Sequence, residues 1–143
     1  MDKQAELEAT RGVAVAFLTH CFAGRMDVAI DLLAPDASWW VIGDPAKVRV
    51  SGLKDRPRIE RMLTNLRKAF PDGMQGIIDA VTAEGERVAI EARSTAHAAN
   101  GQVYSNHYHF LVRVQAGRVV QVREYMDTLG LYDFQQAAAA AAG

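Results

Sequence analysis

Apolar positions at helical spacing open the chain. From Ala5 to about Ala23 they recur near every third or fourth residue, which predicts an amphipathic helix that Gly24 ends. The segment DVAIDLLAPD predicts a short second helix with Asp27 as its N-cap and Pro35 as its closing residue. A third helix is predicted from near Asp55 to the FPDG segment, with an apolar stripe of Ile59, Leu63, Leu66 and Phe70.

The rest of the pattern is that of strands. ASWWVIG predicts a strand that Asp44-Pro45 ends, and VRVSG predicts a short extended piece. A further strand is predicted at 76–82. Three longer strands follow in series, with the glycine-containing turns AEGE, ANG and QAG before them, and they are predicted at Arg87–His97, Gln102–Val114 and Arg118–Asp127.

Helices followed by a run of antiparallel strands predict an α+β fold with the helices on one face of the sheet. Strands of this length must curve to wrap around the helices, so we expect a cone with an open mouth and an internal pocket. We expect one domain over 1–131, followed by an Ala-rich tail over 132–143 to which we assign no chemistry.

Composition narrows the classes of partner. Sixteen Lys and Arg residues nearly balance seventeen Asp and Glu residues, so we expect no nucleic-acid or membrane partner. Cys21 is the single cysteine, which excludes an intrachain disulfide and suits a reducing cytoplasm. The charged first ten residues do not look like a signal peptide, so we expect a cytoplasmic protein.

Several segments together resemble a known superfamily. They are FAGRMDVAIDLLAPDASWWV, FPDG, GERVAIEARS and NGQVYSNHYHFLVRVQAGRVVQVREYMDT. They are similar to the NTF2-like superfamily, in its SnoaL-like branch, which is related to ketosteroid isomerases. The resemblance covers about residues 5–130 and implies the cone, chemistry without a metal or other cofactor, and commonly a homodimer. It leaves the reaction open, because this fold hosts isomerases, polyketide cyclases, epoxide hydrolases, dehydratases and transport proteins.

Residues that relatives use for catalysis are mostly replaced. The resemblance places Phe17 where ketosteroid isomerases have a tyrosine, Val41 where they have the general base, and His109 where they have a protonated acid. Epoxide hydrolases have an arginine and an aspartate where this chain has Glu91 and Arg93, with the charges exchanged. We therefore expect neither a standard steroid isomerase nor a close copy of the epoxide hydrolase site.

Strand alternation and the resemblance suggest one inward-facing set from the last two long strands. It comprises His107, His109 and Leu111 from the first strand and Val122, Glu124 and Met126 from the second. His109 and Glu124 would then meet and form an acid–base pair able to move a proton next to a carbonyl. The alternative is a buried hydrogen bond that only satisfies two polar groups.

The alternation of polar and apolar residues does not decide whether the other candidate residues face the pocket. Simple alternation leaves Glu91 and Arg93 in water, whereas the resemblance turns them toward the pocket, where Arg93 would hold an oxyanion. Trp39 is predicted to face the pocket. We predict catalytic roles for His109, Glu124, Arg93 and Glu91, and substrate contacts from Phe17, His20, Trp39, Val41, His107, Leu111 and Met126.

Two functions from different classes fit this sequence. The first is a cofactor-independent enzyme that performs isomerisation, aldol-type or elimination chemistry on a small hydrophobic or aromatic molecule. The second is a protein of the same shape that binds a small ligand without turnover; hydrolase-like or cyclase-like activity is a further alternative. We also expect a homodimer through the convex sheet face, on which we place Tyr104, Tyr108, Phe110, Arg123 and Tyr125.

Overall fold

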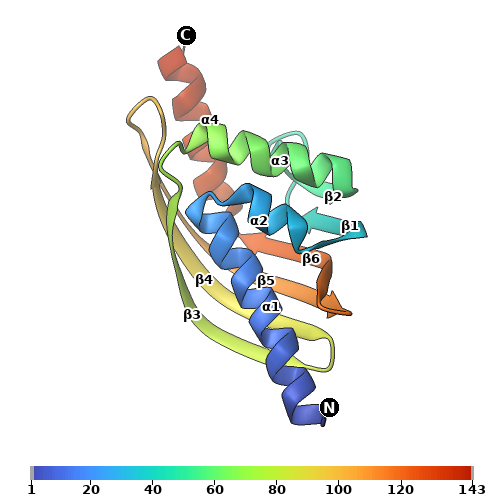
Figure 1. The fold of residues 1–143 in the computed structure, drawn as a ribbon. Coiled ribbons are helices and arrows are strands. Elements are labelled where there is room, and N and C mark those ends of the chain that lie inside the picture. Colours follow the sequence, from blue (N-terminus) through green and yellow to red (C-terminus); the bar gives the residue numbers. More distant parts are fainter. Residues whose placement is uncertain (1, 143) are drawn as a thin grey trace.

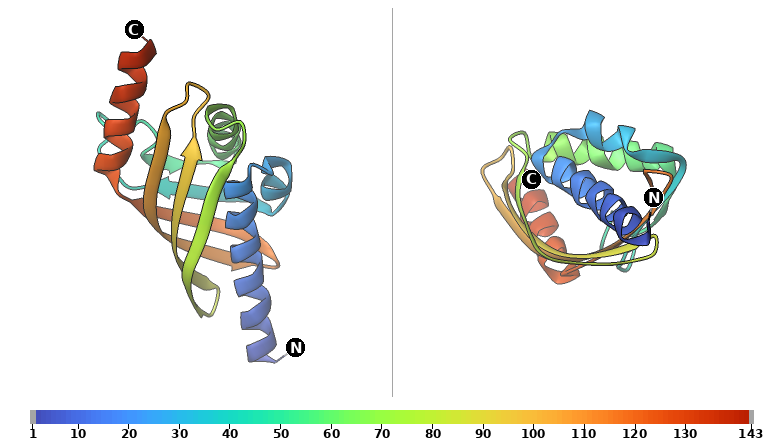
Figure 2. Two further views of the ribbon diagram at one scale, coloured as in Figure 1. Left: turned by 90° about the vertical axis from the view of Figure 1, so that its left-hand side faces the viewer. Right: turned by 60° about the horizontal axis from the view of Figure 1, so that its bottom comes forward.

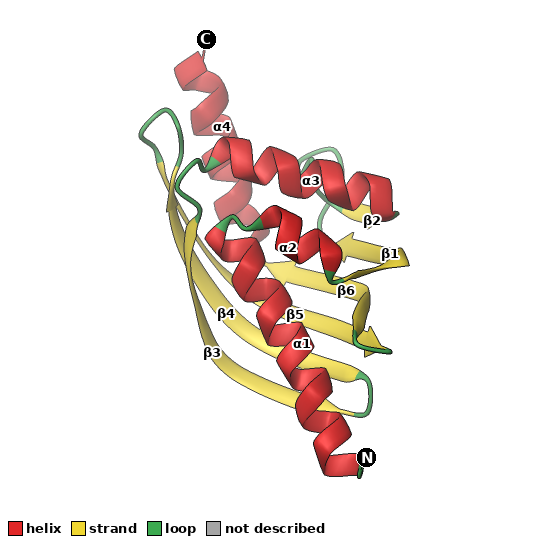
Figure 3. Cartoon of the chain, in the orientation of Figure 1, coloured by secondary structure: helices red, strands yellow, loops and turns green. Residues whose placement is uncertain are grey.

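The computed structural model describes residues 2–142, which form four helices and one six-stranded sheet (Figures 1 and 3). The helices are α1 (Lys3–Ala23), α2 (Met26–Asp31), α3 (Arg56–Ala69) and α4 (Thr128–Ala142). The strands are β1 (Leu33–Val41), β2 (Gly52–Lys54), β3 (Met74–Glu84), β4 (Arg87–His97), β5 (Val103–Gln115) and β6 (Arg118–Met126). The predicted α+β fold is confirmed, and β4 has the predicted bounds.

The sheet is mixed and mostly antiparallel, in the order β2-β1-β6-β5-β4-β3. Only the β1–β6 pair is parallel among the described strands, and it joins the early part of the chain to its last strand. The long strands curve around α1, and α1, α2 and α3 cover the concave face (Figure 2). This arrangement is the predicted cone.

Local sequence explains where the helices begin and end. The side chain of Asp2 accepts a hydrogen bond from the Ala5 amide, and Asp55 caps α3 in the same way by accepting from Arg58. Gly24 ends α1 with a φ of 81°, a left-handed conformation that glycine adopts without strain.

Three local predictions were wrong. The second helix does not reach Pro35, because the chain turns at Leu32 and Pro35 already lies in β1. The VRVSG segment is largely a turn, in which the Ser51 amide donates to the Val48 carbonyl, and the extended piece is β2. The strand predicted at 76–82 is longer at both ends, since β3 pairs with β4 along its full length.

A β-bulge in β6 decides which residues of β6 point inward beyond the bulge. Next to the turn, Val114 pairs with Val119, but the following pair is Arg113 with Gln121, so Val120 is an extra residue. Without this residue His109 would lie opposite Glu124, as we predicted. With it, Phe110 lies opposite Glu124, and a shift of one residue exchanges the two faces of a strand.

The predicted facing of β5 is therefore wrong. Tyr104, Asn106 and Phe110 are buried on the concave face, whereas His107 and His109 are exposed on the convex one. The predicted inward set of β6 is correct: Val122 is fully buried, and Glu124 and Met126 line a cavity inside the cone. Of the residues expected on the convex face, Arg123 and Tyr125 lie there, and Arg123 stacks over Trp40 at 4.3 Å from the ring centroid.

The core lies between α1 and the sheet. Phe17 and Leu18 of α1 pack with Leu33, Ile90 and Val112 of the strands, and each is at most 1% exposed. Packing of this kind fixes the curved sheet against the helix, since close-packed interiors leave side chains little freedom.

The C-terminal segment continues as α4, across residue 131 where we placed the end of the domain. Phe134 of α4 packs on Tyr104 and Phe70, with ring centroids 4.9 Å and 6.0 Å away. The first half of α4 therefore belongs to the aromatic packing at the open end of the cone.

A pair of glycine substitutions tests the packing of α1 on β3. A methyl group at Gly76 would collide with the Phe22 ring, whereas one at Gly12 would meet nothing within 4 Å. We expect Gly76→Ala to lower the free energy of unfolding by about 1–3 kcal/mol, the usual effect of overpacking. The control Gly12→Ala, at an open helical position, should raise it by about 0.5–1 kcal/mol.

Urea denaturation of both variants measures these changes. Equal stability of Gly76→Ala and wild type would show that Phe22 is not held where the structure places it.

Candidate active site

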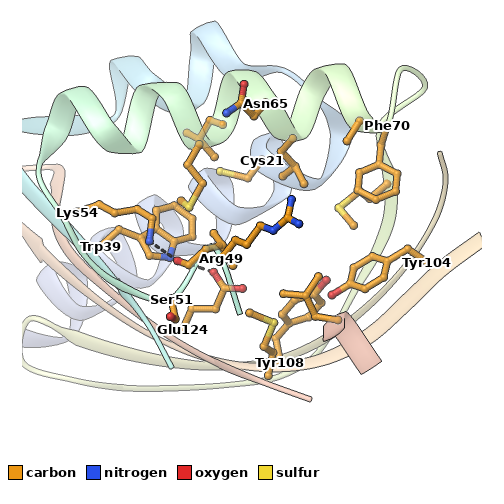
Figure 4. A pocket seen from close by; sticks show the side chains of 18 of the residues that line it. Cys21, Trp39, Arg49, Ser51, Lys54, Asn65, Phe70, Tyr104, Tyr108 and Glu124 are labelled. Carbon is orange, nitrogen blue, oxygen red and sulfur yellow. Dashed lines mark hydrogen bonds between the residues drawn. The ribbon is translucent and has the colours of Figure 1, made fainter. Parts of the chain in front are cut away.

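A cavity of about 650 Å³ occupies the cone between the sheet, α3 and the start of α4. Figure 4 shows Lys54, Trp39 and Glu124 on one side of it, and Phe70 and Tyr104 on the other. Most of its wall is apolar, and Glu124 is the only carboxylate that lines it within residues 2–142. A mostly apolar concavity with a few polar groups is typical of a small-molecule site.

Glu124 projects from β6 into this cavity. Its Oε1 accepts a hydrogen bond of 3.0 Å from the indole Nε1 of Trp39 on the neighbouring strand β1. Burial raises the pKa of Glu124 from 4.5 to about 7, although the Trp39 hydrogen bond and the charge of Lys54 act in the opposite direction. Near neutral pH, Glu124 therefore exists in both its basic and its acidic form, as a general base or acid requires.

Lys54 is the nearest cationic partner of this carboxylate along the wall. Its ammonium group donates hydrogen bonds to the backbone carbonyls of Val50 and Gly52, so the chain itself holds it in place. Burial lowers the pKa of Lys54, while the charge of Glu124 raises it. The two groups thus stabilise each other's charged forms within the cavity.

Two tyrosines form a second polar cluster. The Tyr108 hydroxyl lies 2.7 Å from Ser94 Oγ, and Asn106 donates to the Tyr104 hydroxyl. Asn106 is itself fixed by the backbone of Asp127, whose amide donates to its side-chain oxygen at 3.0 Å. Burial raises the pKa of both phenols, so they remain protonated hydrogen-bond donors at neutral pH.

The predicted His109–Glu124 pair does not form. His109 lies on the exposed face between Glu91 and Tyr125, with the whole thickness of the sheet between it and the cavity. Glu91 and Arg93 are also exposed, and Arg93 pairs with Asp79 of β3 at 3.2 Å. These positions are corrections to our predictions, and of the four predicted catalytic side chains only Glu124 reaches the cavity.

The predicted substrate-contacting residues divide into three groups. Trp39 and Met126 line the cavity, as expected. Phe17 and Val41 are instead buried in the core and do not line the cavity. His20 also lies outside the cavity lining, and it accepts a hydrogen bond from Arg25 at 2.8 Å. His107 and Leu111 lie on the convex face, opposite Arg93 and Ala89 of β4.

Sequence reasoning missed most of the polar wall. Tyr104 and Tyr108 were assigned to the wrong face, and Lys54 lies in a strand of three residues that has no clear pattern. The alternation in β4 did indicate the correct face of β5. Apolar residues alternate in β4 and point inward, and each faces a residue of β5 that also points inward. The pairs are Val88 with Val112, Ile90 with Phe110, and Ala92 with Tyr108. Pairing β5 with β4, rather than with β6, would have placed the tyrosines inside.

Residues 2–142 contain no group of three or more His, Cys, Asp and Glu side chains arranged to hold a metal ion. None of their helices combines the length and the apolar character needed to cross a bilayer. Cys21 lines the cavity, but burial raises the pKa of its thiol, which therefore stays protonated and unreactive.

Comparison with known proteins identifies the class. The SnoaL-like domain family matches residues 14–122, so the chain belongs to the SnoaL-like domain family. No curated protein matches the chain in sequence.

Solved structures show the same fold at low identity, and they include NTF2-like proteins. The BvnE pinacolase from Penicillium brevicompactum has a TM-score of 0.81 and 16% identity, over 95% of this chain and 98% of that one. Bal32a, from a soil-derived mobile gene cassette, has a TM-score of 0.77 and 21% identity, over 90% and 98%. A candidate SnoaL-like polyketide cyclase from Jannaschia sp. CCS1 has a TM-score of 0.73 and 16% identity, over 92% and 94%.

The raised pKa of Glu124 predicts a pH-dependent stability. Between about pH 4.5 and 7 the unfolded chain has lost the Glu124 proton while the folded chain keeps it, so wild-type stability falls as the pH rises through this window. Glu124→Gln removes the titrating group. Relative to wild type, it should gain up to roughly 3 kcal/mol of unfolding free energy between pH 5 and pH 8.

Urea denaturation at both pH values measures this difference. The control Glu91→Gln, on the exposed face, should keep the wild-type pH dependence. The same pH dependence in Glu124→Gln and wild type would contradict the burial of this carboxylate.

Proposed function

We propose that the protein is a cofactor-independent enzyme that uses Glu124 to transfer a proton within a small hydrophobic or aromatic substrate. The observation that carries this proposal is a single carboxylate in an apolar cavity, with a pKa of about 7. Such a group is a stronger base than an exposed glutamate and can return the proton as an acid. This proposal replaces the His109–Glu124 pair with Glu124 alone.

The reaction begins when the Glu124 carboxylate removes a proton from a carbon next to a carbonyl group, or from a hydroxyl group. Trp39 holds the carboxylate through its 3.0 Å hydrogen bond and orients the second oxygen toward the cavity. The oxygen of the resulting enolate carries the new negative charge, which needs a donor.

The tyrosine cluster can supply that donor. When the Ser94 hydroxyl donates to Tyr108, the Tyr108 proton is free to point at a substrate oxygen in the cavity. Return of the proton to a different carbon gives an isomer, while attack of the enolate on a carbonyl gives an aldol product. Loss of a leaving group instead gives elimination.

The family supports an enzyme but does not name the reaction. One structural relative is a pinacolase and another a candidate polyketide cyclase, so the fold carries more than one activity. The alternative function is binding of a small ligand without turnover. Proton abstraction from a small probe distinguishes an enzyme from such a binding protein.

A small aromatic probe tests proton abstraction directly. Nitrobenzisoxazole opens when a base takes its ring C–H proton: the N–O bond breaks, and a coloured cyanophenolate forms. We expect wild-type protein to catalyse this opening, with a rate that rises through a pH of about 7 as Glu124 ionises. Glu124→Gln should lower the rate by about 10²–10⁴-fold.

The matched control is His109→Ala, which changes the exposed face and should leave the rate unchanged. An equal rate in Glu124→Gln and wild type would reject Glu124 as the base. Binding of the probe without opening by wild type would favour the ligand-binding reading.

We also propose that two copies pair through the convex sheet face. This face carries Trp40, Leu111 and Tyr125 among charged side chains, and a broad sheet surface of this kind is commonly covered in an assembly. Light scattering of a dilute sample should give twice the 15.6 kDa of one chain. A mass equal to one chain would contradict the pairing.

A further inference from the structure

The charges that line the cavity differ from those of the whole chain. Over all residues, sixteen basic side chains face seventeen acidic ones. In the cavity, four cations, Arg49, Lys54, Arg58 and Arg61, accompany the single carboxylate Glu124. The cavity therefore has an excess of positive charge that the overall composition does not require.

The three arginines line the cavity from two segments of the chain. Arg49 belongs to the turn before β2, and Figure 4 shows its side chain extended into the cavity. Arg58 and Arg61 are three residues apart in α3, which places them on the same side of that helix. All three are exposed, so their guanidinium groups are accessible to a ligand that enters from solvent.

No carboxylate neutralises this cluster. The ion pairs found among residues 2–142 involve Arg56, Arg93 and Arg113, and none involves Arg49, Arg58 or Arg61. The fourth cation, Lys54, is near enough to Arg58 for the charge of that arginine to contribute to lowering its pKa. Beside Arg49, the Ser51 hydroxyl lines the same wall and has no hydrogen-bond partner within residues 2–142.

The cavity wall also carries two stacked aromatic pairs. Phe70 and Tyr104 stack with centroids 5.8 Å apart, and Tyr108 and Phe110 stack with centroids 5.2 Å apart. A ligand that contacts both the aromatic rings and the cations has a flat apolar body and a negatively charged group. Guanidinium groups bind such oxyanions through paired hydrogen bonds.

We propose that the substrate is an organic anion, an aromatic or polyketide-like body that carries a carboxylate or a comparable acidic group held by Arg49, Arg58 and Arg61. This inference rests on the proposed function, because it assigns the substrate class of the same cavity. The anionic group contacts the arginines, and the reacting carbon lies beside Glu124. Lys54, whose positive charge favours the ionised form of Glu124, limits the repulsion between the substrate anion and that carboxylate.

Two dyes with one skeleton test this assignment. Anilinonaphthalene sulfonate is an anion, and phenylnaphthylamine is the same skeleton without the sulfonate. Both become fluorescent in apolar surroundings, and titrations give their dissociation constants. We expect wild-type protein to bind the sulfonate about tenfold or more tightly than the neutral dye.

The double variant Arg49→Gln/Arg61→Gln should remove most of this preference. It should weaken binding of the sulfonate by about tenfold and leave the affinity for the neutral dye within about twofold. The control Arg87→Gln, an exposed arginine at the start of β4 outside the cavity lining, should keep the wild-type preference. An unchanged affinity for the sulfonate in the double variant would overturn the proposal, as would an equal loss for both dyes.

The same titrations in Glu124→Gln separate this proposal from the proposed reaction. That variant lacks the base but keeps the arginines, so it should keep the preference for the anion. Loss of turnover without loss of preference supports both proposals. Normal opening of nitrobenzisoxazole together with no preference for the anionic dye would overturn the substrate class alone.

Discussion

The extra residue in β6 is the constraint on which the site depends. Because Val120 has no partner on β5, every pair beyond it shifts by one residue, and Phe110 instead of His109 lies opposite Glu124. Because β4 already fixes the inward face of β5, the extra residue changes the facing of β6 beyond it. Without it, Glu124 would lie beside His109 on the convex face, so one unpaired residue brings the carboxylate into the cavity. Bulges near functional sites commonly re-aim side chains in this manner.

The sequence predicts the fold more completely than it predicts the candidate site. Helix caps at Asp55 and Gly24 and the alternation in β4 are local signals, and they predicted the elements correctly. Which residue of β5 pairs with Glu124 is a property of two strands together, and nothing in VQAGRVVQV marks where the register shifts. Glu124 was found because β6 alternates cleanly beyond the bulge. Lys54 and Arg49 were missed because they lie where the local pattern is weak.

Opposed electrostatic effects define the chemistry of the cavity. An apolar wall favours the protonated form of Glu124, while the Trp39 indole and Lys54 favour the charged form. Neither effect dominates, so the carboxylate can change its protonation state near neutral pH. The arginines of the cavity wall add positive charge and form no ion pair with this carboxylate. The carboxylate therefore is not neutralised by the cations that we propose hold the substrate anion.

The parallel pairing of β1 with β6 has a consequence for synthesis of the chain. Trp39 and Glu124 are 85 positions apart, yet their side chains form a hydrogen bond that positions the Glu124 carboxylate. As the chain leaves the ribosome, β1 can pair with β2 but lacks its second neighbour until β6 has emerged. Contacts of such long range form late and slowly. The nascent protein therefore passes through a stage in which helices and β1 exist without a cavity, and the apolar surface of β1 needs protection during that interval.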